Sequence, residues 1–159
     1  MAVQFLDVSA FDLIPIATSL LAVTISAVTF FYQRHSQRKT VTLHMHTIWN
    51  SEGVRRSRRN GFWGIGEAVK HGRISSIKHL SAEQANALLD VKQFFADLND
   101  LLEAGALDNK LSKKLFGAAT KAWFDEILLK VDHDEDEFSH QSRIFFETKV
   151  LPLRNRLLI

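Results

Sequence analysis

Residues 13–32 form a stretch of twenty residues without a charged side chain, LIPIATSLLAVTISAVTFFY. An α-helix rises 1.5 Å per residue, so this stretch would extend about 30 Å, the thickness of the hydrocarbon core of a bilayer. A helix in the core of a soluble protein would carry a polar stripe, whereas this stretch offers only hydroxyl groups. We therefore predict a transmembrane helix over residues 13–32, preceded by a short tail over residues 1–12.

A cleaved signal peptide is the main alternative for this stretch. It would need a basic N-terminal region and small residues before the cleavage site. Here Asp7 and Asp12 precede the stretch, and Phe30, Phe31 and Tyr32 end it. These residues favour a retained anchor, and the aromatic side chains suit a membrane interface.

Basic residues next to the apolar stretch predict its orientation. The first twelve residues contain no Lys or Arg, whereas Arg34, Arg38 and Lys39 follow the stretch directly and form a juxtamembrane anchor. Lys and Arg are enriched on the cytosolic side of membrane helices. We therefore expect a single-pass protein with its N-terminus outside, residues 33–159 in the cytosol, and membrane lipid as a partner.

Small and hydroxyl-bearing residues recur at helical spacing within the stretch. They are Thr18, Ser19, Ala22, Ser26 and Thr29. Such a face lets helices approach closely and form hydrogen bonds across the contact, which predicts a homo-oligomer and, one step further, a water-filled pore. The alternative is that each hydroxyl bonds to the carbonyl one turn earlier in its own helix.

Composition narrows the chemistry of the remaining chain. The 159 residues include no Cys, which excludes disulfides, thiolate-ligated metal sites and a cysteine nucleophile. Residues 33–80 hold ten Lys and Arg against two acids, whereas residues 81–159 hold ten against fourteen acids. This asymmetry is more informative than the net charge of +2 and marks residues 33–80 as a basic juxtamembrane part.

The second half of the chain carries clear helix signals. Ser81 and Gln84 predict a capping box at the start of a helix. The spacing of three and four residues predicts a buried stripe of Leu88, Val91, Phe95, Leu98 and Leu102. Gly105 is expected to end this helix, and Asp108 to cap a short one that breaks near Gly117. A core face is expected to continue through Phe116, Ala119, Trp123, Ile127 and Val131.

Residues 132–137 form an acidic loop, and a last helix follows it. That helix is expected to bury Phe138, Ile144, Phe145 and Leu151 and to be bent or ended by Pro152. The loop lacks the Gly and Glu that an EF-hand needs at its sixth and twelfth positions. It is read as solvated, or as the partner of a basic cluster in a neighbouring subunit.

The basic juxtamembrane part is harder to assign. Residues 41–46 alternate as a strand would, but no partner strand is evident, so we favour continuation of the membrane helix. Ser51 is expected to start the next helix, which runs to about Lys70. The predicted fold class is all-α: one N-terminal transmembrane helix followed by a cytosolic helical bundle of about four or five helices.

Several short motifs resemble one family in their order and spacing. They are Trp49-Asn50-Ser51, then Arg55, Arg56 and Arg59, then Phe94-Phe95 and Leu98, then Gly105-Ala106-Leu107-Asp108, Leu115-Phe116-Gly117 and Trp123. Over residues 33–155 the chain thereby resembles the bacterial family catalogued as domain of unknown function 4760. The resemblance implies a membrane-anchored helical domain, here in the bacterial inner membrane, with no established activity. In architecture alone the chain is also similar to small membrane effectors of antiphage (CRISPR-associated) systems.

The densest functional signal is a cluster of arginines followed by aromatic residues. It consists of Arg55, Arg56, Arg58, Arg59, Phe62 and Trp63. Guanidinium groups pair with phosphate, and aromatic rings stack on bases or lie at headgroup level. Three interpretations stay open: a solvated face with salt bridges to the acidic half, contact with anionic lipid, and binding of RNA or a nucleotide messenger.

Two Arg–His pairs resemble the Arg-x(4–6)-His motif of HEPN ribonucleases, all-α domains that usually act as dimers. They are Arg38 with His44 and Arg73 with His79. There the histidine would act as general acid or base and the arginine would stabilise the phosphorane. Chance matches are expected with seven His in the chain. His44 and His46 could chelate a metal on a strand but not on a helix, so we expect no metal site, and no motif indicates a cofactor.

The leading hypothesis is a non-enzymatic, oligomeric membrane effector or sensor. Its cytosolic domain would receive an anionic ligand or partner (RNA, a nucleotide messenger or a cytosolic protein) and act on the membrane, in its most concrete form as a pore-forming antiphage-defence protein. The alternatives are a membrane-tethered HEPN-like ribonuclease, and a non-catalytic anchor or scaffold that binds a partner protein through residues 94–123.

Overall fold

The computed structural model describes residues 10–74, 76–131 and 143–158, and side chains from residue 13 onward. The chain divides into two compact units, Met1–Gln37 and Arg38–Ile159. The described residues form helices and short connections without a β-strand, which confirms the predicted all-α fold class.

The first unit holds the apolar part of helix α1 (Ala10–Trp49). Every described side chain from residue 13 to residue 32 is exposed. Within the described residues, α1 is the one helix long and apolar enough to cross a membrane, as the sequence predicts. The helix continues to Trp49, so residues 41–46 are helical and not a strand.

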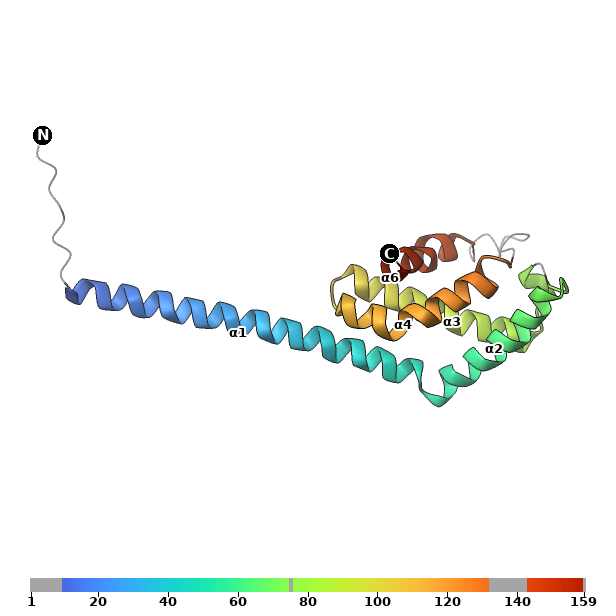
Figure 1. Ribbon diagram of the computed structural model, residues 1–159, viewed down its shortest axis with the longest axis horizontal. Helices are drawn as coiled ribbons and strands as arrows, with labels where there is room; N and C mark the ends of the chain where they lie inside the picture. Colours follow the sequence, from blue (N-terminus) through green and yellow to red (C-terminus); the bar gives the residue numbers. More distant parts are fainter. Residues whose placement is uncertain (1–9, 75, 132–142, 159) are drawn as a thin grey trace, which may run out of the picture. The chain divides into compact units, whose positions relative to one another are not determined.

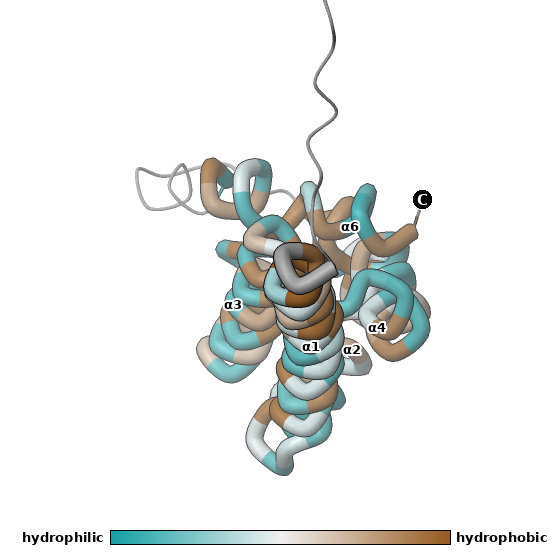
Figure 2. The backbone as a smooth tube through the Cα atoms, turned by 90° about the vertical axis from the view of Figure 1, so that its left-hand side faces the viewer, coloured by the Kyte–Doolittle hydropathy of each residue, from teal (hydrophilic) through white to brown (hydrophobic). Residues whose placement is uncertain are grey.

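The second unit begins with the last part of α1 and continues through a bundle of helices. These are α2 (Glu52–Lys70), the 3₁₀ turn η1 (Ile77–His79), α3 (Ala82–Glu103), α4 (Asn109–Trp123), the π turn η2 (Phe124–Leu128), the π turn η3 (Phe146–Val150) and α6 (Leu151–Leu158). Helices α3 and α4 lie between α2 on one side and α6 on the other (Figure 1). In Figure 2, α3 and α4 each alternate between hydrophobic and hydrophilic residues, as expected of helices with one buried face.

A row of aromatic rings forms the centre of this bundle. Its buried members are Trp49, Phe94, Phe95, Phe116, Trp123, Phe124 and Phe146. The ring of Trp49 lies 4.6 Å from that of Phe94 and 5.6 Å from that of Phe95, between centroids. Burying each such ring stabilises the fold by roughly 1.5–3 kcal/mol, so the end of α1 is fixed firmly to α3.

The predicted start and end of α3 are confirmed. The Ser81 hydroxyl accepts a hydrogen bond from the Gln84 backbone N–H at 3.2 Å, and the Gln84 side chain accepts one from the Ser81 backbone N–H at 3.0 Å. The predicted stripe of α3 is buried along its whole length. The chain leaves the helix through Gly105, whose φ of +64° is a left-handed conformation that favours glycine.

Two predictions about the last helices are wrong. Helix α4 does not break at Gly117 but continues to Trp123, because its packing against α6 outweighs the roughly 1 kcal/mol that a glycine costs inside a helix. The final core face is also shifted: Ile144 is exposed, Phe145 and Leu151 are only partly buried, and the buried residues are Phe146, Val150, Leu153 and Leu157.

The π turn η3 explains both the shift and the tolerance of Pro152. A π turn holds an extra residue, so the side chains after it face a different direction from those of a regular helix. Pro152 lies two residues after the last residue of the π turn, where the regular hydrogen-bond pattern is already interrupted, and helical backbone continues to Leu158, so Pro152 does not end the helix. The predicted acidic loop at residues 132–137 and Phe138 lie outside the described residues.

Candidate anion-binding groove

Helix α2 places an arginine in the middle of its inward-facing stripe. Val54, Arg58, Gly61 and Ile65 follow one another at helical spacing, and Ile65 is fully buried. Gly61 brings the helix close to the core, because an added Cβ would lie 3.0 Å from Cη2 of Trp123. Arg58 is therefore held partly buried at a position where the pattern calls for an apolar side chain.

The Arg58 guanidinium has few partners of its own. Its central carbon lies 4.0 Å from the centre of the Trp49 ring, a cation–π contact. It also donates a long hydrogen bond of 3.4 Å to Oδ1 of Asn50. Its Nε is buried without a hydrogen-bond acceptor in the described part of the chain. Burial lowers the pKa of Arg58 from its usual value, and the nearby charge of Arg55 lowers it further.

A groove of about 330 Å³ opens beside this arginine. Its lining consists of Trp49, Arg55, Arg58, Arg59, Phe62, Trp63, Ala119, Ala122 and Trp123. We call it the arginine groove. The ring centroids of Phe62 and Trp123 are 5.5 Å apart and form part of its wall. Three guanidinium groups thus share one aromatic-walled depression, and the described lining contributes no carboxylate.

The cluster predicted from the sequence is divided by this arrangement. Arg55, Arg58, Arg59, Phe62 and Trp63 line the arginine groove, whereas Arg56 is exposed and does not. The ion pairs given by the described residues, such as Lys149 with Asp100 and Arg156 with Glu103, leave the whole arginine cluster out. Salt bridges to residues 132–137, the remaining acidic candidates, fall outside the described part.

A second hollow of about 450 Å³ adjoins the arginine groove. Its lining consists of Arg59, Asn60, Trp63, Gly64, Ser81, Glu83 and Gln84, so the two depressions share Arg59 and Trp63. The Asn60 amide donates a hydrogen bond to Oε1 of Glu83 at 2.9 Å. Hydrogen-bonding groups and one carboxylate therefore lie at one end, and guanidinium groups at the other.

The hydrogen bonds given by the described residues join neither of the Arg–His pairs considered for a ribonuclease. Arg38 and His44 lie six positions apart on α1, so their side chains point about 120° apart around the helix. Arg38 is partly buried near Gly105, whereas His44 is exposed. Arg73 and His79 are both exposed, and the described hydrogen bonds include none between them.

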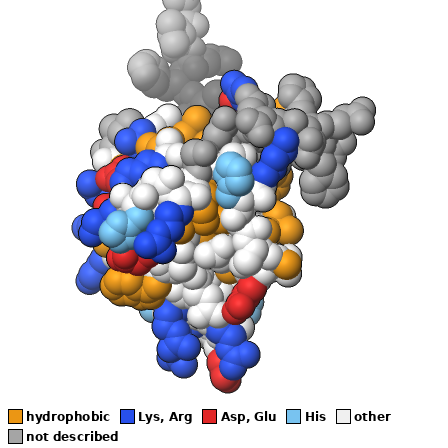
Figure 3. Space-filling model, turned by 90° about the vertical axis from the view of Figure 1, so that its right-hand side faces the viewer, with side chains coloured by type: hydrophobic (Ala, Val, Ile, Leu, Met, Phe, Trp, Pro, Cys, Tyr) orange, Lys and Arg blue, Asp and Glu red, His pale blue; other side chains and the backbone are white. Residues whose placement is uncertain are grey.

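The C-terminal part of α2 and η1 form an end of the domain that is basic and exposed to solvent. Lys, Arg and His side chains gather on one side of this face (Figure 3). The only acid paired there among the described residues is Glu67, 3.3 Å from Nε2 of His71. This face presents charge to solvent without the burial that makes the arginine groove a defined site.

His44 and His46 point to nearly opposite sides of α1, so this helix does not let them share a metal ion. The His46 ring lies 6.0 Å from that of Phe116 and 3.0 Å from the Asn50 amide. Its role is packing at the end of α1.

The residues predicted for the membrane segment are exposed, with one exception. Thr18, Ser19, Ala22, Ser26 and Thr29 are all exposed, as are Arg34 and Lys39. The Thr18 hydroxyl donates to the carbonyls of Ile14 and Pro15, each at 3.0 Å, which is the local bonding considered as the alternative to helix association. The exception is Arg38, which belongs to the helical domain.

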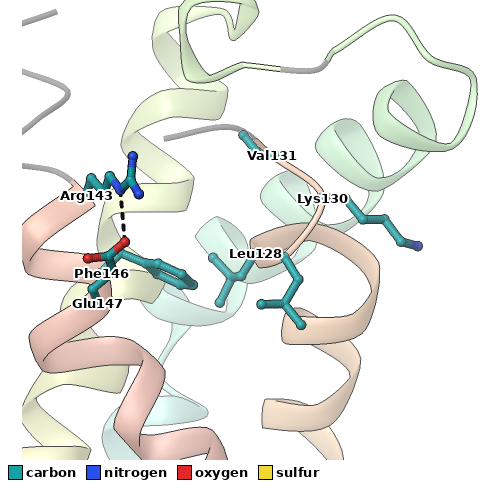
Figure 4. Close-up of a pocket in the computed structure, with 7 residues that line it drawn as sticks. Leu128, Lys130, Val131, Arg143, Phe146 and Glu147 are labelled. Atoms are coloured by element: carbon teal, nitrogen blue, oxygen red, sulfur yellow. Dashed lines mark hydrogen bonds and ion pairs between the residues drawn. The ribbon is translucent and has the colours of Figure 1, made fainter. Parts of the chain in front are cut away.

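Another pocket, of about 340 Å³, lies between residues 128–131, at the end of η2 and just after it, and residues 143–147. Figure 4 shows Arg143 beside Glu147, joined by a hydrogen bond of 2.9 Å from Nε to Oε1, and Phe146 opposite Leu128. The described residues that line this pocket carry no candidate site.

Lys92 is the one lysine buried in the described core, with 2% of its surface exposed. Its Nζ lies 5.8 Å from the centre of the Phe146 ring. Burial lowers the pKa of Lys92 to about 8. This lysine affects stability and lies apart from the arginine groove.

Sequence reasoning missed Trp49 and Trp123 as walls of the groove and treated them only as packing residues. Trp49 is separated from Arg58 by the turn between α1 and α2 and meets it only in the folded chain. The available signal was Arg58 itself, because a charged residue interrupts the apolar spacing of Val54, Gly61 and Ile65.

Comparisons of this chain with protein-family models, with curated proteins and with solved structures find no match. The resemblance to the domain of unknown function 4760 therefore stays a prediction. Two structural features bear on function, the geometry of the arginine groove and the exposure of α1.

Proposed function

We propose that the protein is a membrane-anchored receptor that binds an anionic ligand in the arginine groove and acts as an effector or sensor at the bacterial inner membrane. Residues 13–32 would span the membrane, and the helical domain would lie in the cytosol. The proposed role is non-enzymatic.

Arg58 is the observation that carries the ligand-binding proposal. A charge removed from water costs free energy unless an opposite charge or hydrogen bonds compensate it. Arg58 is partly buried beside Arg55, with a buried Nε that lacks an acceptor among the described residues. A position that breaks the local folding pattern without internal compensation is typical of a functional site. An anion between Arg55, Arg58 and Arg59 would supply the missing charge.

The exposure of α1 supports the membrane anchor. Large apolar side chains such as Leu20, Val28 and Phe31 are more than half exposed. An apolar helical surface of this length matches a bilayer in extent. Arg34 and Lys39 are exposed directly after it, as the positive-inside rule requires of a cytosolic side.

Self-association is the less supported part of the proposal. The small-residue face of Thr18, Ala22, Ser26 and Thr29 is exposed and would allow close contact between helices. In an oligomer, several arginine grooves would surround one axis, and ligand binding could alter the packing of the spans. A pore for antiphage defence is the most specific form of this hypothesis.

Binding of an inorganic polyanion tests the receptor proposal. Full-length protein in detergent would be titrated with tripolyphosphate by calorimetry. We expect binding that Arg58→Leu weakens at least about tenfold, the loss of roughly 1.4 kcal/mol or more that a charge-assisted contact represents. Arg56→Leu, which removes the same charge from the same helix outside the groove, is the matched control, and we expect it to weaken binding less than about threefold. Equal losses in both variants would show attraction by general charge and contradict a defined site.

A further inference from the structure

The arginine groove has more aromatic surface than an inorganic anion needs. Trp63 is 65% exposed at the place where the groove meets the second hollow, and it packs edge-on against Phe62 with 6.1 Å between centroids. An exposed tryptophan between two depressions presents a flat apolar face beside guanidinium groups. That combination matches a ligand with an aromatic ring joined to a phosphate.

We propose that this site binds a nucleotide, with its phosphates on Arg55, Arg58 and Arg59 and its base stacked on Trp63. The inference rests on the proposed function and names the class of ligand. The two depressions, of about 330 and 450 Å³, share Arg59 and Trp63, and each is in the size range of small-ligand pockets.

The charge of the lining gives the nucleotide a direction. Glu83 lines the second hollow, whose lining includes Arg59 but neither Arg55 nor Arg58, and its carboxylate would repel a phosphate there. The phosphates would therefore occupy the arginine groove and the base the second hollow. Oε1 of Glu83 already accepts from the Asn60 amide, which leaves Oε2 of Glu83 and Oδ1 of Asn60 as acceptors in the described structure. These acceptors favour a base with an exocyclic amino group, such as adenine.

Adenosine triphosphate and tripolyphosphate form the deciding pair of probes, because they carry the same chain of phosphates and differ in the nucleoside. Both would be titrated into full-length protein in detergent without divalent cations. We expect adenosine triphosphate to bind about tenfold more tightly, the gain typical of one base stacked on an aromatic side chain. Trp63→Ala should weaken the binding of adenosine triphosphate much more than that of tripolyphosphate and so remove the preference, whereas Trp63→Phe should retain most of it.

Leu89→Ala is the matched control, because Leu89 is 58% exposed on α3 outside both depressions. We expect it to leave both affinities unchanged. The outcomes separate the two proposals. Equal binding of both probes, unaffected by Trp63→Ala, would overturn the nucleotide and keep the anion receptor. Binding of neither probe would overturn both. Tighter binding of a single-stranded oligoadenylate than of adenosine triphosphate, growing with its length, would overturn the mononucleotide in favour of RNA.

Discussion

Leu20 and Val28 in the apolar stretch of α1 are each 64% exposed, whereas Val91 and Leu98 of α3 are fully buried. The two helices use the same kinds of apolar side chain. In α3 these side chains recur every three or four residues and meet the rest of the bundle, whereas in α1 they surround the helix. Helix α3 therefore has apolar surroundings within the chain, whereas the apolar stretch of α1 requires them from outside the chain.

Helix α2 is an intermediate case that extends the comparison. Its inward stripe is apolar at Val54 and Ile65 but carries the charge of Arg58 between them. In the proposal, an anion would supply the missing charge there, just as a bilayer would supply the apolar surroundings of α1. The following substitutions test these differences between the helices.

Phe95→Ala should have the largest effect, because it removes a fully buried ring of the α3 stripe. This ring stacks on Trp49 at 5.6 Å and on Phe124 at 6.0 Å. A Phe to Ala change at such a site destabilises by about 3–5 kcal/mol. Denaturant unfolding monitored by circular dichroism would measure the loss, with Leu89→Ala as the exposed control at less than about 0.5 kcal/mol. Similar losses in both variants would mean that Phe95 is not a core residue.

Val23→Asp should detach the apolar stretch from its proposed environment and leave the bundle folded. Val23 is 67% exposed in α1. A carboxylate near the middle of a membrane helix costs about 2.5–3.5 kcal/mol of insertion free energy. We expect the fraction of protein that resists alkaline extraction from membranes to fall, with Val23→Leu unchanged. Full retention of the Asp variant would argue against a span at residues 13–32.

Lys92 makes stability depend on pH within the bundle. Its pKa in the folded chain is about 8, below the usual 10.5, so the unfolded chain holds the proton more tightly between these values. Stability therefore rises as the pH increases from about 8 to 10.5. Relative to Lys92→Met, the wild type should gain on the order of 2–3 kcal/mol across this interval. A stability difference between the two proteins that stays constant from pH 7.5 to 10.5 would contradict the burial of a charged lysine.

Arg58→Leu should have the smallest effect of these changes, and it should increase the stability of the fold. It continues the apolar stripe of α2 and removes a partly buried charge, although the cation–π contact with Trp49 is lost. We expect a gain of about 0.5–1 kcal/mol in the free energy of unfolding, as when functional residues are replaced by well-packed apolar ones. Arg56→Leu, on the exposed side of α2, should change it by less than about 0.5 kcal/mol.

Most of the fold could be predicted because its signals are local. The capping box of Ser81 and Gln84, the left-handed exit at Gly105 and the stripe of α3 depend on residues within a few turns. The continuation of α4 through Gly117 could not be predicted, because it depends on packing against α6, which lies far along the chain. The π turn at residues 146–150 has no pattern that precedes it, so the final core face was placed on the wrong residues.

The candidate site was predicted in part for the same reason. Its arginines lie within residues 55–59 and are therefore visible in the sequence, but composition alone treats Arg56 and Arg58 alike. Only the packing of α2 separates the exposed Arg56 from Arg58, which contacts Trp49 and lines the groove. The aromatic wall from Trp123 is contributed by another helix and required the folded structure.

The most direct test of the central claim is the melting temperature of the wild type and of Arg58→Leu, each with and without tripolyphosphate. A ligand that binds only the folded state stabilises it according to its affinity. We expect Arg58→Leu to have a higher melting temperature than the wild type without the anion. A saturating anion should raise the melting temperature of the wild type alone, and so narrow or reverse the difference between the two proteins. If Arg58→Leu melts lower without the anion and both proteins respond to it equally, Arg58 is a structural residue and the arginine groove is not a receptor site.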